Sequence, residues 1–179
     1  MQTKTLSIAY SSALTKLFAV ATFTLLTVVS AKIRFPLPFT PVPVTFQVFA
    51  VLLSGVVIGP WLGGLSQLLY VGLGCLGLPV WAGGGGTSAI LGPTGGYILA
   101  FPIASFTVAL LVRKSRTAIQ KSFALAAGLL VIYLLGALWL ANYLRLDLSS
   151  TLKLGVFPFI LIDTVKLLLI LPFALRVKE

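Results

Sequence analysis

The chain has 179 residues, of which 59% are hydrophobic and 9% are charged, and its mean hydropathy is +1.11. Because a soluble domain carries roughly a quarter charged residues, this chain has too little polar surface to cover a globule in water, and we expect its apolar surface to face lipid. One cysteine and no histidine argue against an internal disulfide, a zinc site and histidine-based acid–base catalysis.

Hydrophobic segments of near membrane-spanning length predict an all-α integral membrane protein, a bundle of six transmembrane helices in a single domain over residues 1–179. Gly59-Pro60 and Pro79 divide the 78 uncharged residues between Arg34 and Arg113. Apolar segments continue to the C-terminus, so we do not expect a soluble protein with a removable signal peptide. The helices are expected at Ala13–Ala31, Val44–Ile58, Trp61–Leu78, Gly95–Val112, Phe123–Leu144 and Gly155–Leu175.

The first helix is preceded by Ala9 and opened by Ala13, a spacing of small residues that lets another helix approach closely. The segment Arg34–Gln47 contains four prolines, at positions 36, 38, 41 and 43, which forbid a regular helix interior. It is too apolar for a solvated linker. We expect it to pack at the membrane interface or against the outer side of the bundle; the alternative is a plain connector.

Thr45 and Gln47 lie at the start of the second helix, and Gln67 and Tyr70 lie in the third. Each of these side chains is a candidate for ligand contact, although hydrogen bonding between helices is an equally good explanation. Trp81 is a further candidate for ligand contact. The alternative role of this residue is anchoring at the membrane interface, which is also possible for Tyr97, Trp139 and Tyr143.

A glycine-rich loop follows the third helix and contains Gly83, Gly84, Gly85, Gly86 and Thr87. It matches no phosphate-binding fingerprint. Glycine allows the backbone to approach a ligand closely and to move. In an outer loop beside a binding cavity, this composition indicates a lid; an ordinary flexible loop is the alternative.

The strongest candidate pair is Asp163 and Lys166, inside the sixth hydrophobic span. Their spacing of three places them on one helix face. Ionisable residues within a span cost a few kcal/mol and usually face the bundle interior, where they serve function. A carboxylate acceptor beside an ammonium donor suits a ligand with both N–H and C=O groups. A structural ion pair is the alternative.

The distribution of basic residues predicts that both termini are cytoplasmic and that the glycine loop is outside. The net charge of +10 does not indicate a nucleic-acid partner, because the basic residues are scattered between hydrophobic spans. The expected inner segments carry Lys4, Lys16, Arg113, Lys114, Arg116, Lys121, Arg176 and Lys178, and the expected outer loops carry Lys32, Arg34, Arg145 and Lys153.

Four stretches together resemble the BioY family, the biotin-binding S components of energy-coupling factor (ECF) transporters. They are "PLPFTPVPVTFQVFAVLLSGVVIGPWLGGLSQLLYVGLGCLGLPVWAGGGG" (residues 36–86), "LGPTGGY" (91–97), "IYLLGALWL" (132–140) and "GVFPFILIDTVK" (155–166). The resemblance covers nearly all of the chain after the first helix, and the order and spacing of the stretches make it specific.

The resemblance implies a six-helix bundle in the cytoplasmic membrane with an outward-facing pocket for biotin under the first and third interhelical loops. It implies that Asp163 and Lys166 belong to that pocket and that Ala9 and Ala13 contact a transmembrane coupling protein. Two ATPase subunits complete the assembly, so the chain itself is expected to be no enzyme and to need no cofactor or metal.

The glycine loop departs from the family pattern in one respect. Some members place an Asn and an Arg in or just after it, whereas this chain has no basic residue between Arg34 and Arg113. The biotin carboxylate is then expected to bind loop amides, Thr87, Ser88 or Lys166.

Two other classes of function compete with transport. One is an intramembrane enzyme that uses Asp163, although a lone carboxylate without a partner at a recognisable spacing makes a poor hydrolase. The other is an intramembrane scaffold whose Asp163–Lys166 pair is purely structural.

Overall fold

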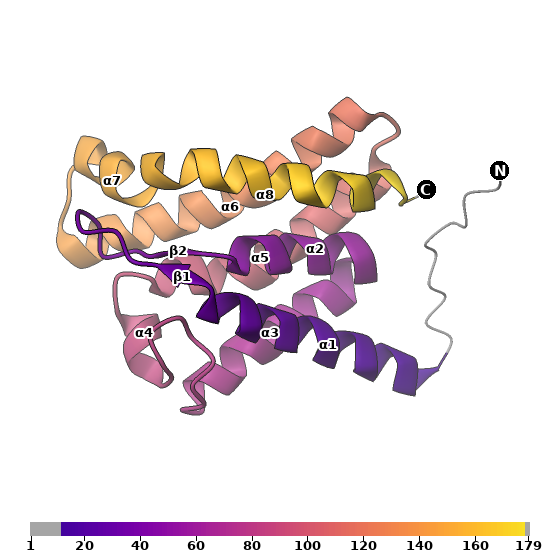
Figure 1. Ribbon diagram of the computed structural model, residues 1–179, viewed down its shortest axis with the longest axis horizontal. Coiled ribbons are helices and arrows are strands. Elements are labelled where there is room, and N and C mark those ends of the chain that lie inside the picture. The colour runs from indigo at the N-terminus through magenta and orange to yellow at the C-terminus, as the bar shows by residue number, and fades with distance from the viewer. Residues whose placement is uncertain (1–11, 178–179) are drawn as a thin grey trace.

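The computed structural model describes residues 12–177 and shows a bundle of helices with one small two-stranded hairpin (Figure 1). The hairpin pairs β1 with β2 in antiparallel register. The elements are α1 (Ala13–Lys32), β1 (Arg34–Phe35), β2 (Val44–Thr45), α2 (Gln47–Ile58), α3 (Pro60–Cys75), α4 (Thr87–Leu91), α5 (Gly95–Lys114), α6 (Ala118–Leu144), α7 (Leu148–Gly155) and α8 (Phe157–Leu175).

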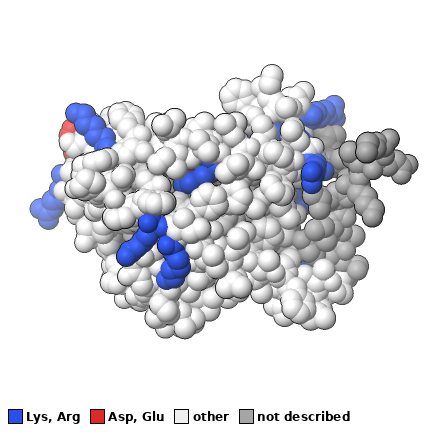
Figure 2. Space-filling view, viewed as in Figure 1, with Lys and Arg blue, Asp and Glu red and all other residues white. Residues whose placement is uncertain are grey.

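Within residues 12–177, four helices, α1, α5, α6 and α8, are long and apolar enough to cross a membrane, whereas α2 is apolar but has only 12 residues. An all-helical, multi-pass membrane protein is therefore confirmed. The long helices run roughly along the horizontal axis of Figure 1, and large apolar side chains such as Phe18 and Trp61 are 64% and 78% exposed on its outside. Most of the face in Figure 2 carries no charged side chain, as expected of a surface in contact with lipid.

Several helix bounds differ from those expected. α6 begins at Ala118 rather than Phe123, because Thr117 and Gln120 form a reciprocal capping box that starts the helix earlier. α3 ends at Cys75, before Gly77, whose φ of +94° is left-handed.

The helix expected at Gly155–Leu175 is α8, which begins at Phe157, whereas Gly155 ends α7, a short helix that the sequence did not lead us to expect. Val156 has φ −129° and ψ −61°, which is not helical, and Pro158 then lies in the first turn of α8, where proline is well tolerated. The break turns the chain, so that α7 lies beside the C-terminal end of α6 in Figure 1.

Small residues bring α2, α3 and α5 into close contact. A Cβ atom built on Gly55 would lie 2.1 Å from the carbonyl oxygen of Ser105, and one on Gly63 would lie 2.9 Å from the Cα of Gly55. Such contacts leave no space for a side chain. Small residues let membrane helices pack backbone to backbone in this way.

Polar side chains bridge these helices inside the bundle. Gln67 donates to Ser54 and to Thr27 at 3.2 Å each, and the hydroxyls of Ser54 and Ser105 lie 2.9 Å apart. Gln67 is fully buried, so the hydrogen-bonding explanation holds for this residue. Among the described residues, no buried side-chain nitrogen or oxygen lacks a hydrogen-bond partner, as a low-dielectric interior requires.

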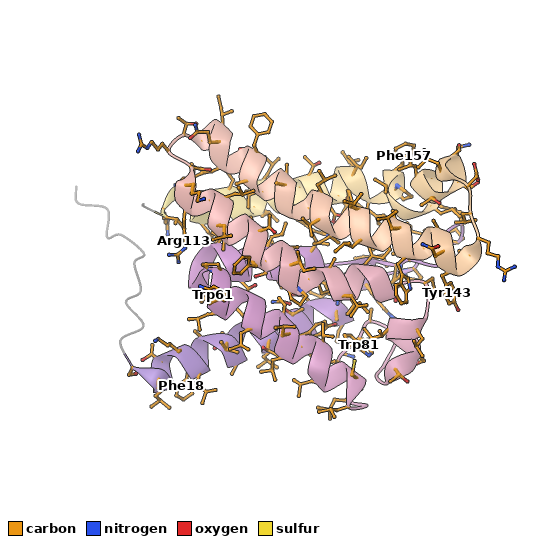
Figure 3. All side chains as sticks on the ribbon, turned by 180° about the vertical axis from the view of Figure 1, so that it is seen from behind. Phe18, Trp61, Trp81, Arg113, Tyr143 and Phe157 are labelled. Atoms are coloured by element: carbon orange, nitrogen blue, oxygen red, sulfur yellow. The ribbon has the colours of Figure 1, made fainter. Side chains whose placement is uncertain are left out.

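The two ends of the bundle differ in composition. The start of α1, the end of α8 and the turn between α5 and α6 lie together at one end, whereas the hairpin, α4 and α7 lie at the other (Figure 1). Figure 3 shows Trp81, Tyr143 and Phe157 at the hairpin end and Arg113 at the opposite end.

Within the bundle, Lys121 connects α6 to the last turn of α8 by donating to the carbonyls of Ala174 and Val177, at 3.0 and 2.6 Å.

Candidate ligand-binding cavity

A cavity of about 400 Å³ opens at the hairpin end of the bundle, between α2, α5, α6 and α8. This volume lies in the range of small-molecule sites. The proline-rich segment and the glycine loop form its outer wall. It is lined by Arg34, Pro36, Thr40, Pro41, Val42, Pro43, Val44, Thr45, Gln47, Val48, Trp81, Ala82, Gly83, Gly84, Gly85, Ser88, Ala89, Pro93, Thr94, Tyr97, Ile98, Phe101, Ile132, Tyr133, Phe159, Asp163 and Lys166.

Asp163 and Lys166 meet in the inner part of this cavity. The Lys166 ammonium donates to Asp163 Oδ1 at 2.5 Å and to the backbone carbonyl of Thr45 at 2.6 Å. The other carboxylate oxygen accepts from the Tyr133 hydroxyl at 2.7 Å. Asp163 and Lys166 are only 3% and 4% exposed. Their mutual charge balance and these additional bonds make the burial of both groups tolerable.

The proline-rich segment folds back as the β1–β2 hairpin and does not act as a plain connector. Val42 and Val44 are buried, and the Thr40 hydroxyl donates to the carbonyl of Leu154 at 2.7 Å. The segment thus packs against the bundle, as expected. Its second strand also explains why the expected helix at Val44 begins only at Gln47, since the backbone of Val44–Thr45 pairs with Arg34–Phe35 instead.

Gln47 lines the cavity, and its amide donates to the Tyr70 hydroxyl at 2.7 Å. Tyr70 itself is not a lining residue. It is fully buried behind the wall, where its hydroxyl donates to the carbonyl of Val80 and its ring meets Trp81 edge-to-face at 5.1 Å. The structure therefore gives Tyr70 the role of a support for Gln47 and Trp81.

The glycine loop is partly ordered by its own hydrogen bonds. The Trp81 backbone N–H donates to the carbonyl of Gly84 at 2.7 Å, and the Trp81 indole N–H donates to the carbonyl of Gly86 at 3.1 Å. Lys32, at the end of α1, donates to the carbonyls of Pro79 and Trp81 at 2.5 and 3.0 Å. The base of the loop is therefore fastened to α1.

Only part of the predicted loop reaches the cavity. Gly83, Gly84 and Gly85 line it, whereas Gly86 and Thr87 do not. Thr87 instead begins the short helix α4, so the stretch is not one continuous loop.

The alternative role of the aromatic residues as interfacial anchors fails for Trp81 and Tyr97. Trp81 is 1% exposed and Tyr97 8%, and the Tyr97 hydroxyl donates to the carbonyl of Gly155 at 2.7 Å. Both side chains are parts of the interior and line the cavity.

Sequence reasoning missed Arg34 and Tyr133 as lining residues. Tyr133 lies in a stretch that carried the family resemblance, but nothing local marked it as a neighbour of Asp163. Arg34 was counted only as a loop charge. Of the two predicted partner-contact residues, Ala13 is exposed at the end of the bundle opposite the cavity, and Ala9 lies outside the described residues.

The arrangement favours binding over catalysis. The interior of the cavity offers an ion pair with a tyrosine and a glutamine, surrounded by apolar side chains such as Phe101 and Ile132. Within residues 12–177, no group of three or more His, Cys, Asp or Glu side chains is placed to hold a metal ion. A few convergent polar groups in an apolar pocket are typical of small-molecule recognition.

The family match and the similar proteins found by sequence comparison agree with each other. The chain matches the BioY family over residues 1–179. It is 51% identical over 148 residues to a probable biotin transporter BioY of Pyrococcus horikoshii, covering 82% of this chain and 86% of that one. It is 41% identical over 158 residues to the biotin transporter BioY of Thermotoga maritima, covering 88% and 92%.

A solved structure has the same fold. The crystal structure of the S-component for biotin from an ECF-type ABC transporter superposes with a TM-score of 0.85 at 25% sequence identity, over 95% of this chain and 94% of that one. Together, the family match and these relatives show that the chain belongs to the BioY family.

Proposed function

We propose that this chain is the substrate-capture subunit of an ATP-driven transporter, and that it binds biotin at the outer side of the cytoplasmic membrane for uptake. Relatives that are 51% and 41% identical to it over the aligned residues are named biotin transporters, and the S-component for biotin shares its fold. These similarities extend over most of the chain. The family consists of transporter components, so an intramembrane enzyme built on Asp163 is not supported.

The observation that carries the proposal is the buried Asp163–Lys166 pair inside a cavity of about 400 Å³. Biotin has a ureido head with two N–H donors and one carbonyl acceptor. An ionised carboxylate accepts N–H groups strongly, and an ammonium or an amide N–H donates to the carbonyl. Asp163, Lys166 and Gln47 supply these groups, while apolar lining residues suit the sulfur-containing ring and the alkyl chain.

The proposal also includes the number of membrane crossings and the side of the membrane on which the termini lie. α2 and α3 would complete six crossings together with the four long helices, and both termini would be cytoplasmic. The cavity end of the bundle carries Lys32, Arg34, Arg145 and Lys153, whereas the larger group of basic residues lies toward the other end. Since cytoplasmic segments are enriched in Lys and Arg, the cavity would open outward.

The proposed partners are a transmembrane coupling protein and two ATPase subunits, which would hydrolyse ATP. Ala13 is the described candidate for contact with the coupling protein, because it is small, exposed and at the end of α1 opposite the cavity. A small residue lets a second helix approach closely in the membrane.

Calorimetric titration of the purified chain with biotin tests the proposal. Heat release with a stoichiometry near one supports it. The competing scaffold hypothesis is favoured by the hydrogen bonds that Asp163 and Lys166 make to each other, to Tyr133 and to Thr45, and it predicts no heat with biotin. No binding by a monodisperse, folded preparation would therefore refute the transport proposal.

A further inference from the structure

The charges that line the cavity are not balanced. Of the described lining residues, two are cationic, Arg34 and Lys166, and one, Asp163, is anionic. Lys166 is neutralised by Asp163 through the ion pair at 2.5 Å. The Arg34 guanidinium has no hydrogen-bond or ion-pair partner within residues 12–177. The described lining of the cavity therefore carries one uncompensated positive charge, and it is located on Arg34.

The hairpin register holds Arg34 over the cavity. Arg34 pairs with Thr45 across the two strands, and the carbonyl of Thr45 accepts from Lys166. Paired residues of an antiparallel ladder have Cα atoms about 5 Å apart. Arg34 therefore lies on the neighbouring strand, further from the ion pair than Thr45. The Arg34 side chain is exposed, whereas the Lys166 side chain is buried.

The glycine loop comes close to the same guanidinium. A Cβ atom on Gly83 would lie 3.9 Å from Arg34 Nη1. Among the described residues, the backbone N–H groups of Gly83 and Gly85 make no hydrogen bond. A guanidinium fork and free backbone amides are the donors that proteins use for carboxylates.

We propose that Arg34 binds the free carboxylate of the ligand at the mouth of the cavity, and that it makes the site selective for the free acid over its amide or ester. This inference rests on the proposed function and adds a selectivity to it. Of the holders expected from sequence, Lys166 gives two of its three N–H groups to Asp163 and Thr45 and is assigned to the ureido head with the third, and Thr87 does not line the cavity. Ser88 lines it but carries no charge.

The geometry matches the shape of such a ligand. The ureido head would lie at the buried pair, and the alkyl chain would lead outward past the apolar wall to Arg34. The two ends of the ligand would then be recognised separately. The Asp163–Lys166 pair, which has no net charge, would bind the neutral head, and Arg34 would bind the charged tail. The ligand carboxylate would cancel the one remaining charge of the cavity.

The test compares two ligands on two proteins. Biotin and biotinamide, which differ in the tail charge, are titrated into the wild-type chain and into Arg34→Gln. The wild type is expected to prefer biotin by about tenfold, the effect of one partly exposed charge-assisted hydrogen bond. Arg34→Gln should lose about tenfold in biotin affinity and much less in biotinamide affinity, so the preference disappears.

Two further variants serve as controls. Lys153→Gln removes an exposed cation at the same end of the bundle that does not line the cavity, and it should keep the preference for biotin. Arg34→Lys retains the charge without the planar fork and should keep part of it. These variants separate a local carboxylate contact from a general loss of positive charge and from misfolding.

Each outcome decides a different point. If Arg34→Gln keeps the wild-type preference, Arg34 does not hold the carboxylate, although biotin binding itself stands. If Arg34→Gln weakens both ligands equally, the residue only supports the hairpin, and the inference is wrong. If the wild type binds neither ligand, the proposed function fails and this inference fails with it.

Discussion

Replacing Asp163 with asparagine removes the one negative charge among the described lining residues of the cavity while keeping the size of the side chain. Asp163 accepts from Lys166 at 2.5 Å and from Tyr133 at 2.7 Å, and it is 3% exposed. The amide retains one acceptor but loses the ionised form that would accept the ureido N–H groups. A hydrogen bond to a charged group contributes about 1.5–3 kcal/mol. We therefore expect biotin affinity to fall by about ten- to a hundredfold.

The complementary variant, Lys166→Ala, should be at least as damaging, but for two reasons at once. It removes a donor to the ligand, and it leaves two buried acceptors, the Asp163 carboxylate and the carbonyl of Thr45, without the ammonium that donates to them. Breaking a buried pair by removing one partner costs about 3–5 kcal/mol. Its effect on binding is thus mixed with an effect on stability. Asp163→Asn also removes the counterion of Lys166, but it keeps a side-chain acceptor beside that ammonium and is therefore the milder perturbation.

The assay is calorimetric titration of detergent-purified protein, with monodispersity and thermal stability measured on the same preparation. Thr164→Val is the matched control, because Thr164 neighbours Asp163 on α8 but is exposed and bonds only to the carbonyl of Ile160. It should bind biotin as the wild type does. A purely structural pair predicts the opposite pattern, in which Asp163→Asn expresses poorly while the folded fraction binds normally. Wild-type affinity in folded Asp163→Asn protein would refute the assignment of Asp163 to the ligand site.

Three further predictions concern the loop, the partner surface and the packing. Gly85→Val should change the rates of biotin association and dissociation in stopped-flow measurements, because a Cβ there would lie 2.1 Å from the carbonyl of Leu78 and force the loop to move; unchanged rates in folded protein would argue against a gate. Ala13→Leu should leave biotin binding by the isolated chain intact but reduce co-purification with the ATPase module, and normal co-purification would contradict the partner assignment. Gly55→Ala should lower thermal stability by an amount corresponding to about 1–3 kcal/mol, because its Cβ would lie 2.1 Å from the carbonyl of Ser105; an unshifted melting curve would mean that α2 and α5 separate easily.

Local sequence patterns were sufficient for the features that depend on near neighbours in the chain. Hydropathy over a span of about 20 residues indicates a membrane helix regardless of what it packs against. The helical repeat likewise placed Asp163 and Lys166 on one face, and the structure shows them paired at 2.5 Å. Charge in an apolar span marked the pair as exceptional because burying an unpaired charge is costly.

The rest of the cavity depends on residues that are far apart in sequence. Tyr133 meets Asp163 from 30 positions away, and Lys166 reaches Thr45 from 121 positions away. No periodicity connects such residues, since their distance depends on how whole helices pack and where loops fold back. Arg34 looked like one more loop charge until the hairpin register placed it over the cavity. Helix-forming tendency is set locally, whereas the convergence of side chains on one ligand is set by the packing of the entire bundle.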